Sequence, residues 1–170
     1  MKNIILMLFI SCILTGCKED DEFISKKQPY SGSELRTDGY YYKKENNEYM
    51  GFLCFYKDGC LLTMSGRDSS LELADNYIER VFVHNAFHKE KPLYWGLFLI
   101  QNNNQLKMEY YRGSNWGKEV YVKEGVILND TTFKINTMYR IDGSNRQNQN
   151  YIYHFRQFSP KPDSTNNFIK

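Results

Sequence analysis

The stretch LYWGLFLIQNNNQLKMEYYR, residues 93–112, decides the fold. Its first eight residues are apolar on both alternating faces, which is typical of a strand that is buried on both sides. The polar QNNN that follows predicts a turn. The last eight residues alternate, with Leu106, Met108 and Tyr110 on one face and charged residues on the other. This period of two indicates a half-buried strand, so the stretch predicts an antiparallel hairpin.

Working outward from this hairpin, six other segments predict strands. They are residues 39–43, 49–56, 60–65, 119–128, 131–140 and 151–158. The resulting eight strands are joined mostly by hairpin-length links, which predicts an antiparallel meander. Eight such strands suit an up-and-down barrel, because closure removes the edge strands; an open sandwich is the alternative. We therefore expect an all-β fold with one helix, in a single domain of residues 36–158.

The one expected helix spans about residues 70–84. Ser69-Ser-Leu-Glu72 fits a capping box, and an apolar stripe follows at helical spacing. The stripe comprises Leu73, Tyr77, Ile78, Val81 and Phe82, and the residues expected to face water are Glu72, Asp75, Glu79 and Arg80. The helix either packs on the outside of the barrel wall or plugs one end.

The side chains expected inside the barrel are mostly large, which predicts a filled interior with recognition at the loop mouth. The interior candidates are Trp95, Leu97, Leu99, Met108 and Phe133. An aromatic side chain on a loop can stack on a sugar ring or on a partner protein. The expected ligand or partner contacts are Trp116, Trp95 and Tyr110.

Two cysteines, Cys54 and Cys60, flank the turn Lys57-Asp58-Gly59. A two-residue Asp-Gly turn would place them on opposite faces and exclude a disulfide. A three-residue turn with Gly59 in the left-handed conformation would place them on one face as diagonal neighbours, at the long end of the range for a disulfide. The sequence leaves both turns open.

Three segments, FYKDGC, YWGLFLIQNNNQLKMEYY and GVILNDTTFKI, resemble the lipocalin-like, or calycin-like, domains of small bacterial lipoproteins. The resemblance covers roughly residues 36–158. It implies a lipocalin-like barrel that holds a small apolar ligand. This chain lacks the Gly-x-Trp marker near its first strand, and its helix lies between the third and fourth strands.

The N-terminus, MKNIILMLFISCILTGC, has a charged start, an apolar middle and a small-residue end, as a secretory signal peptide does. Leu14-Thr15-Gly16-Cys17 resembles the lipobox of bacterial lipoproteins. The resemblance implies cleavage after a signal peptide of residues 1–16 and a lipid on Cys17, which would anchor the chain to a membrane. Two or three acyl chains anchor a protein stably.

Residues 17–35 are expected to form a lipidated acidic linker. The run Lys18, Glu19, Asp20, Asp21 and Glu22 predicts a solvated segment and resembles the sorting signal of lipoproteins that are exported to the outer face of the outer membrane. We therefore expect a lipid-anchored protein of the outer membrane that faces the cell exterior. Residues 159–170 predict a polar C-terminal tail on the surface.

Composition narrows the function further. The net charge is +2, and removal of the signal peptide removes the positive charge of Lys2, which argues against a nucleic-acid partner. No catalytic, phosphate-binding or cofactor motif is present, so we expect neither an enzyme nor a cofactor. His84 and His88 lie near the expected end of the helix, where a positive charge is favourable. We therefore expect them to face solvent and not to bind a metal ion. The expected role is a binding or interaction module. Its partner would be an envelope protein, or a small apolar or glycan ligand held in the barrel; a hydrolase is the remote alternative.

Overall fold

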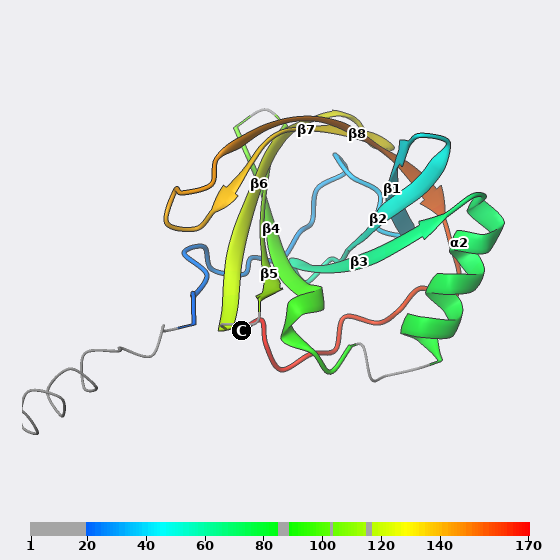
Figure 1. The fold of residues 1–170 in the computed structure, drawn as a ribbon, viewed down its shortest axis with the longest axis horizontal. Coiled ribbons are helices and arrows are strands. Elements are labelled where there is room, and N and C mark those ends of the chain that lie inside the picture. Colours follow the sequence, from blue (N-terminus) through cyan, green and yellow to red (C-terminus); the bar gives the residue numbers. More distant parts are fainter. Residues whose placement is uncertain (1–19, 85–88, 103, 115–116) are drawn as a thin grey trace, which may run out of the picture.

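The computed structural model describes residues 20–84, 89–102, 104–114 and 117–170. Within them, eight strands pair in sequence order into a closed barrel, and one short α-helix lies outside it (Figure 1). In chain order these are β1 (Gly39–Glu45), β2 (Glu48–Phe55), β3 (Cys60–Asp68), α2 (Leu71–Ile78), β4 (Trp95–Gln101), β5 (Gln105–Ser114), β6 (Gly117–Asn129), β7 (Thr132–Arg140) and β8 (Gln147–Gln157).

All neighbouring strands are antiparallel, and β1 pairs with β8 to close the barrel. At this closure Tyr41 lies opposite Phe155, and Lys43 lies opposite Tyr153. Because the barrel is closed, no strand within the described residues is a free sheet edge. A free edge would expose unpaired backbone groups that can pair with another chain. The all-β, up-and-down barrel with one helix is therefore confirmed, and the open sandwich is excluded.

Large apolar side chains from all eight strands fill much of the barrel interior. This inner cluster comprises Tyr41, Leu53, Phe55, Leu61, Phe98, Leu106, Met108, Ile127, Phe133, Ile135 and Tyr153, together with Leu35 from the segment before β1. The rings of Phe133 and Tyr153 stack with their centroids 4.8 Å apart. Met108 and Phe133 lie inside as the sequence predicted.

The segment before β1 crosses one end of the barrel, which we call the closed end. The backbone N–H of Tyr30 donates to the carbonyl of Lys57 in the β2–β3 turn, at 2.8 Å. The N–H of Arg36 donates to the carbonyl of Asp130 in the β6–β7 turn, at 3.0 Å. Leu35 is only 3% exposed between these contacts. The other end, where β5 ends and β6 begins, is called the mouth.

A second, outer cluster covers the outside of β1 to β4. It comprises Tyr40, Phe52, Cys54, Tyr56, Cys60, Leu62, Met64, Ala74, Ile78, Phe82, Trp95, Leu97 and Ile169. Trp95 and Leu97 therefore face outward, with Leu99 packed beside them, and the prediction that these three residues line the interior is wrong. A strand that is apolar on both faces carries no signal for which face is inner, and a one-residue slip exchanges the two faces.

The helix packs on the outside of the barrel wall. The Ser70 hydroxyl caps it by accepting the N–H of Leu73 at 3.2 Å. A π-helical turn (Glu79–Val83) continues α2, so the buried residues Ala74, Ile78 and Phe82 recur at spacings of four. Leu73, expected in the apolar stripe, is 49% exposed. The predicted stripe was therefore displaced by one residue at its start.

Asp75, expected to face water, instead fastens the helix to the barrel. Its carboxylate accepts the Tyr40 hydroxyl at 2.8 Å and the Arg156 Nε at 2.9 Å, and Arg156 Nη2 donates to it as well. Charge-assisted pairs of this bidentate kind also fix geometry. The helix is thus held by polar contacts to β1 and β8 in addition to its apolar face.

The C-terminal segment, residues 159–170, packs against the same side of the barrel as α2 (Figure 1). Ile169 is 5% exposed in the outer cluster. The Lys161 ammonium donates to the carbonyls of Thr37 and Phe55 at 2.7 and 2.6 Å, and the Tyr56 hydroxyl donates to the carbonyl of Pro162 at 2.8 Å. The expected surface tail is therefore part of the packed domain.

The β2–β3 hairpin has the three-residue turn. The N–H of Tyr56 donates to the carbonyl of Cys60 at 3.1 Å, and Gly59 has φ of +88°, where a side chain would be strained. Cys54 and Cys60 therefore share the outer face. Both are buried free thiols, so the disulfide that this turn left open is not formed.

Candidate functional site

Three cations and four tyrosines lie on the inner side of the barrel wall toward the mouth. We call this group the cationic chamber: Lys43, Arg112, Lys123, Tyr110, Tyr121, Tyr151 and Tyr153. Directly paired residues on neighbouring strands point to the same face. Lys123 lies opposite the inner residue Met108, and Lys43 lies opposite the inner residue Tyr153. The register thus directs both lysines inward.

Each cation of the chamber lies over a tyrosine ring. The Lys43 ammonium is 3.5 Å from the centroid of Tyr151, and the Lys123 ammonium is 4.8 Å from that of Tyr110. The Arg112 guanidinium is 5.0 Å from the centroid of Tyr121. Such contacts stabilise a cation by about 0.5–2 kcal/mol but do not neutralise its charge. These ring contacts therefore leave the three positive charges in place.

Lys123 carries the clearest electrostatic signature. Burial, together with the positive charges of Lys43 and Arg112, lowers the pKa of Lys123 from 10.5 to about 8. Lys43 pairs with Glu45 at 2.9 Å, whereas no carboxylate among the described residues forms an ion pair with Lys123. A buried charge is costly unless it is paired. An anion that entered the chamber would supply the missing partner.

Two tyrosines of the chamber, Tyr110 and Tyr153, are held in their neutral form. Burial raises the pKa of both Tyr110 and Tyr153. The Tyr110 hydroxyl donates to Met138 Sδ at 3.4 Å, a weak acceptor. These rings therefore present apolar faces and neutral hydroxyl groups beside the cations, a combination that suits an anion with an apolar body.

Two surface pockets reach members of the chamber. One, of about 220 Å³, is lined by Tyr110 and Arg112 together with Thr63, Ser65, Leu93, Tyr94, Tyr111 and Gly113. It lies where β3 and β4 pair over only three residues, so the wall is incomplete near the mouth. The other, of about 400 Å³, is lined by Lys43 and Tyr151 together with Lys44, Glu45, Asn150, Ile152 and His154.

A further pocket, of about 420 Å³, lies outside the barrel beside the C-terminal segment. Its lining includes Lys89 and Asp163, which pair at 2.6 Å. The hydrogen bond from Lys89 lowers the pKa of Asp163 to about 2. Because Lys89 and Asp163 already neutralise each other, neither charge needs a ligand as its partner. The chamber is therefore the better candidate for a binding site.

The three aromatic residues expected to contact a ligand or partner have different positions. Tyr110 belongs to the chamber. Trp95 has no exposed surface, and its Nε1 donates to the carbonyl of Lys89 at 2.7 Å, so the structure does not place it at a binding surface. Trp116 lies outside the described residues.

The chamber cations were not singled out from the sequence, although strand alternation carries a signal for two of them. Lys123 follows Tyr121 by two residues, and Lys43 follows Tyr41 by two. Once the inner face of each strand is known, this spacing places both lysines inside.

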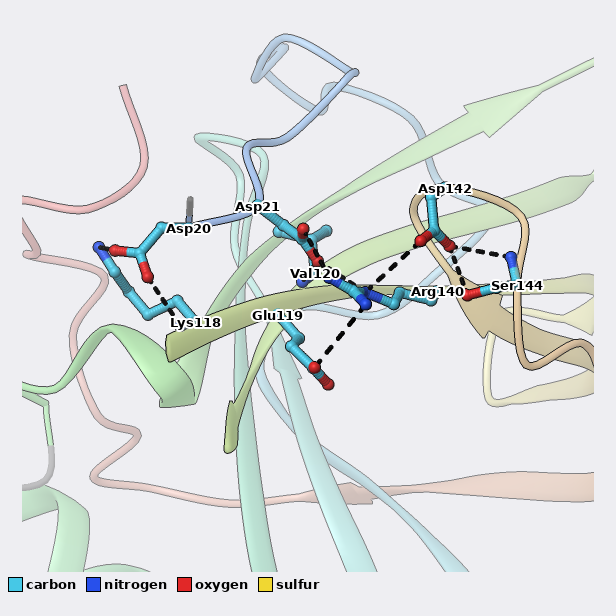
Figure 2. Close-up of polar contacts among 8 residues, drawn as sticks. All are labelled: Asp20, Asp21, Lys118, Glu119, Val120, Arg140, Asp142 and Ser144. Carbon is cyan, nitrogen blue, oxygen red and sulfur yellow. Dashed lines mark hydrogen bonds and ion pairs between the residues drawn. The ribbon is translucent and has the colours of Figure 1, made fainter. Parts of the chain in front are cut away.

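The acidic run is not a free tether over its described part. The Asp20 carboxylate accepts the Lys118 N–H at 2.9 Å and pairs with its ammonium at 3.0 Å (Figure 2). The backbone hydrogen bond from Lys118, followed by that from its side chain, lowers the pKa of Asp20. Cys17, Lys18 and Glu19 lie outside the described residues. Glu22 is exposed.

The Asp21 carboxylate accepts three hydrogen bonds from two strands of the barrel. Arg140 donates two of them, at 3.0 and 2.9 Å, and the N–H of Val120 donates the third, at 3.1 Å (Figure 2). The N–H of Asp21 donates to the carbonyl of Lys118 at 3.0 Å. The expectation of a solvated segment is therefore wrong for Asp21, whose side chain is 16% exposed, whereas Asp20 stays exposed although it pairs with Lys118.

Glu109 continues this docking along β5. Its side chain is fully buried, and it accepts the N–H groups of Ile24 and Ser25 at 3.0 and 3.1 Å and the Ser25 hydroxyl at 2.6 Å. The Lys107 ammonium pairs with it at 2.7 Å. Phe23 packs its ring edge-on against Tyr111, with centroids 4.5 Å apart. Residues 20–25 thus form a docked segment along the outside of β5 and β6.

No group of three or more potential ligands that could hold a metal ion occurs within the described residues. His84 lies 3.2 Å from the Glu79 carboxylate, and His88 lies outside the described part of the chain. Across the described ranges, no helix has the length and apolar character needed to cross a membrane.

In comparisons with known proteins, no family model, no curated protein and no solved structure matched this chain.

Proposed function

We propose that this chain is a lipid-anchored binding protein of the bacterial outer membrane, exposed on the cell surface, whose barrel captures a small organic anion with an apolar body. It acts by binding and not by catalysis. The observation that carries the ligand class is Lys123, an inward-facing lysine whose charged neighbours are two further cations and whose ring neighbour is Tyr110.

The packing of the barrel supports a shallow site near the mouth. The inner cluster fills the barrel from the closed end with aromatic and aliphatic side chains. Eight-stranded barrels are just wide enough to be filled in this way or to hold one small ligand. The chamber is the part of the interior that lysine, arginine and tyrosine side chains line, and two surface pockets reach some of its residues. This arrangement favours an anion at the mouth over the alternative of a wholly apolar ligand or a glycan deep in the barrel.

The anchor rests on the sequence Leu14-Thr15-Gly16-Cys17, and surface display rests on Lys18 and the acidic residues that follow it. A closed eight-stranded antiparallel barrel is compatible with the lipocalin-like domains that the sequence resembles. We infer that this resemblance extends to the lipoprotein class.

The ligand class can be tested with 8-anilinonaphthalene-1-sulfonate, an aromatic anion whose fluorescence reports binding. We expect saturable binding to the purified protein and competition by decanoate. Lys123→Met should weaken binding at least several-fold. Lys134→Met is the matched control, because Lys134 alternates with the inner residues Phe133 and Ile135 and so faces outward. Equal binding by both variants would refute the proposed site.

The anchor and the sorting signal need separate variants. Cys17→Ser should abolish labelling by an alkyne fatty acid and release the protein from membranes. Changing Glu19 and Glu22 to Ala tests the sorting signal without touching the contacts of Asp20 and Asp21. We expect these changes to keep lipidation and to reduce protease accessibility on whole cells. Unchanged accessibility would remove the sorting role.

A further inference from the structure

The docked segment lies very close in sequence to the proposed anchor. Only Lys18 and Glu19 separate Cys17 from Asp20. Consecutive Cα atoms of an extended chain advance by at most about 3.6 Å, so the three steps from Cys17 to Asp20 span at most about 11 Å. The Cα atom that carries the proposed lipid attachment therefore cannot lie farther than this from the Cα atom of Asp20.

The docked segment meets the barrel at its mouth. Asp20 and Asp21 contact Lys118 and Val120, at the start of β6, and Arg140, at the end of β7. Figure 2 shows these contacts together at the end of the two strands, with Asp142 and Ser144 of the following loop beside Arg140. The chain therefore reaches the barrel at the mouth and not at the closed end.

Three successive sets of contacts hold the docked segment in place. Lys118 binds Asp20, Arg140 binds Asp21, and the buried Glu109 binds the backbone at Ser25. The Glu109 contact is shielded from water, so it is screened by salt much less than a surface pair would be. The docked segment therefore begins only two residues after Cys17 in the sequence, which leaves Lys18 and Glu19 between it and the proposed lipid attachment site.

We infer that the barrel stands with its mouth against the membrane that carries its lipid, so that the membrane surface is the partner of the mouth and the closed end points away. This inference rests on the proposed lipidation of Cys17. The closed end lies a strand length from the mouth: β7 has nine residues, which corresponds to roughly 30 Å along the strand at about 3.3 Å per residue and to less along the barrel axis, because the strands of a barrel tilt. A ligand of the chamber would then enter from the membrane side.

The test uses the full lipidated protein, reconstituted into vesicles of phosphatidylcholine and phosphatidylglycerol. A cysteine is introduced at Asn148, near the start of β8 at the mouth, or at Lys57, in the turn at the closed end, and is labelled with a fluorophore. Both positions are exposed, whereas Cys54 and Cys60 are buried. A short-range quencher on the lipid headgroup should quench the label at position 148 several-fold more strongly. Equal quenching at the two ends, or stronger quenching at position 57, would overturn the inference.

A spacer variant supplies the control. Inserting a flexible Gly-Ser spacer between Glu19 and Asp20 leaves the docked segment intact but frees the barrel from the anchor. We expect the difference between the two labels to disappear; its persistence would show that the anchor does not set the orientation. Intact mass measurement of each sample keeps the two proposals distinguishable. Absence of the lipid mass refutes the anchor, whereas a lipidated protein without preferred orientation refutes only the placement at the membrane.

Discussion

Arg140 donates two hydrogen bonds, of 3.0 and 2.9 Å, to the carboxylate of Asp21. Arg140 ends β7 and lies 119 positions after Asp21 in the chain, so this pair fastens the docked segment to the barrel. The hydrogen bonds that Arg140 donates to Asp21 are the largest influence on the pKa of Arg140 and raise it above its ordinary value. Both side chains are mostly buried, with relative exposures of 17% and 16%. This pair converts an acidic run into a structural element.

Arg140→Met should loosen the docked segment without unfolding the barrel. Because the fork of an arginine matches a carboxylate in a way that methionine cannot, Asp21 would lose its partner. We expect limited proteolysis to cut within residues 20–27 several-fold faster. Arg146→Met, which alters another cation near the mouth, is the control and should leave the rate unchanged. Equal rates for the two variants would show that Asp21 does not hold the segment.

Glu109→Gln should lower the free energy of unfolding and should make that free energy depend less on pH below neutral pH. Burial acts to raise the pKa of Glu109, but the hydrogen bonds from Lys107 and Ser25 outweigh it and leave the pKa below 4.5. A lowered carboxyl pKa adds stability above the unfolded value and loses it as the pH falls through the folded value. Stability that depends on Glu109 should therefore decline from about pH 4.5 downward. Loss of a buried charged acceptor costs about 1–3 kcal/mol.

Urea unfolding of Glu109→Gln and of the native protein between pH 3 and pH 7 would measure both effects. Glu72→Gln, on the exposed first turn of α2, serves as the control. If the native protein and Glu109→Gln show the same pH dependence, the docked segment does not draw its stability from this carboxylate.

Lys123→Met should stabilise the empty barrel at pH 7. The folded state disfavours the charged lysine, so its pKa lies near 8 while the unfolded value is 10.5. Between these values the unfolded chain binds more protons, and stability rises with pH. One pKa unit corresponds to about 1.4 kcal/mol; with a discount for the partial exposure of Lys123, we expect a gain of about 2 kcal/mol.

The advantage of Lys123→Met should shrink as the pH rises from 8 to 10, because the native lysine becomes neutral. Guanidinium unfolding of both proteins measures the difference between their free energies of unfolding. The tyrosines titrate in both proteins, so their contribution cancels in this difference. A variant less stable than the native protein at pH 7 would contradict the assignment of Lys123 as an uncompensated charge.

Cys54 and Cys60 should resist alkylation until the protein unfolds. Burial raises the pKa of Cys54 to about 12 and that of Cys60 to about 11. The reactive thiolate is therefore scarce at neutral pH, and both thiols are enclosed. Iodoacetamide at pH 8 should label neither residue in the native state and both in guanidinium, as read by peptide mass spectrometry. Rapid native labelling would place them at the surface.

Local patterns in the sequence were enough to predict the strands, the hairpins and the helix, but not whether the helix packs outside the barrel or plugs one end. They were not enough where a choice depends on distant residues. Trp95 was assigned to the wrong face because its strand is apolar on both sides. Asp21 and Glu109 were read as water-facing because charged residues usually are. Only the folded arrangement shows that each of them meets a partner from the other end of the chain.

The chamber illustrates the same limit. Lys43 and Lys123 follow inner aromatic residues by two positions, so alternation could have placed them inside once the barrel was assumed. Alternation does not show that the two lysines lie near each other, or that Lys123 forms no ion pair within the described chain. Both features follow from the closure of β1 on β8 and from the register of β5 with β6.

The most direct test of the proposed anion site is the ionisation of Lys123 itself, followed by NMR in protein carrying ¹³C at the lysine ε-carbons. The spectrum of Lys123→Met identifies the resonance. We predict a titration midpoint near pH 8 in the free protein, shifted toward the ordinary lysine value when decanoate binds, and no shift with the neutral 1-decanol. A midpoint near 10.5 in the free protein, or one that decanoate leaves unchanged, would contradict the claim that Lys123 lacks an anionic partner in the free protein and gains one when an anion binds.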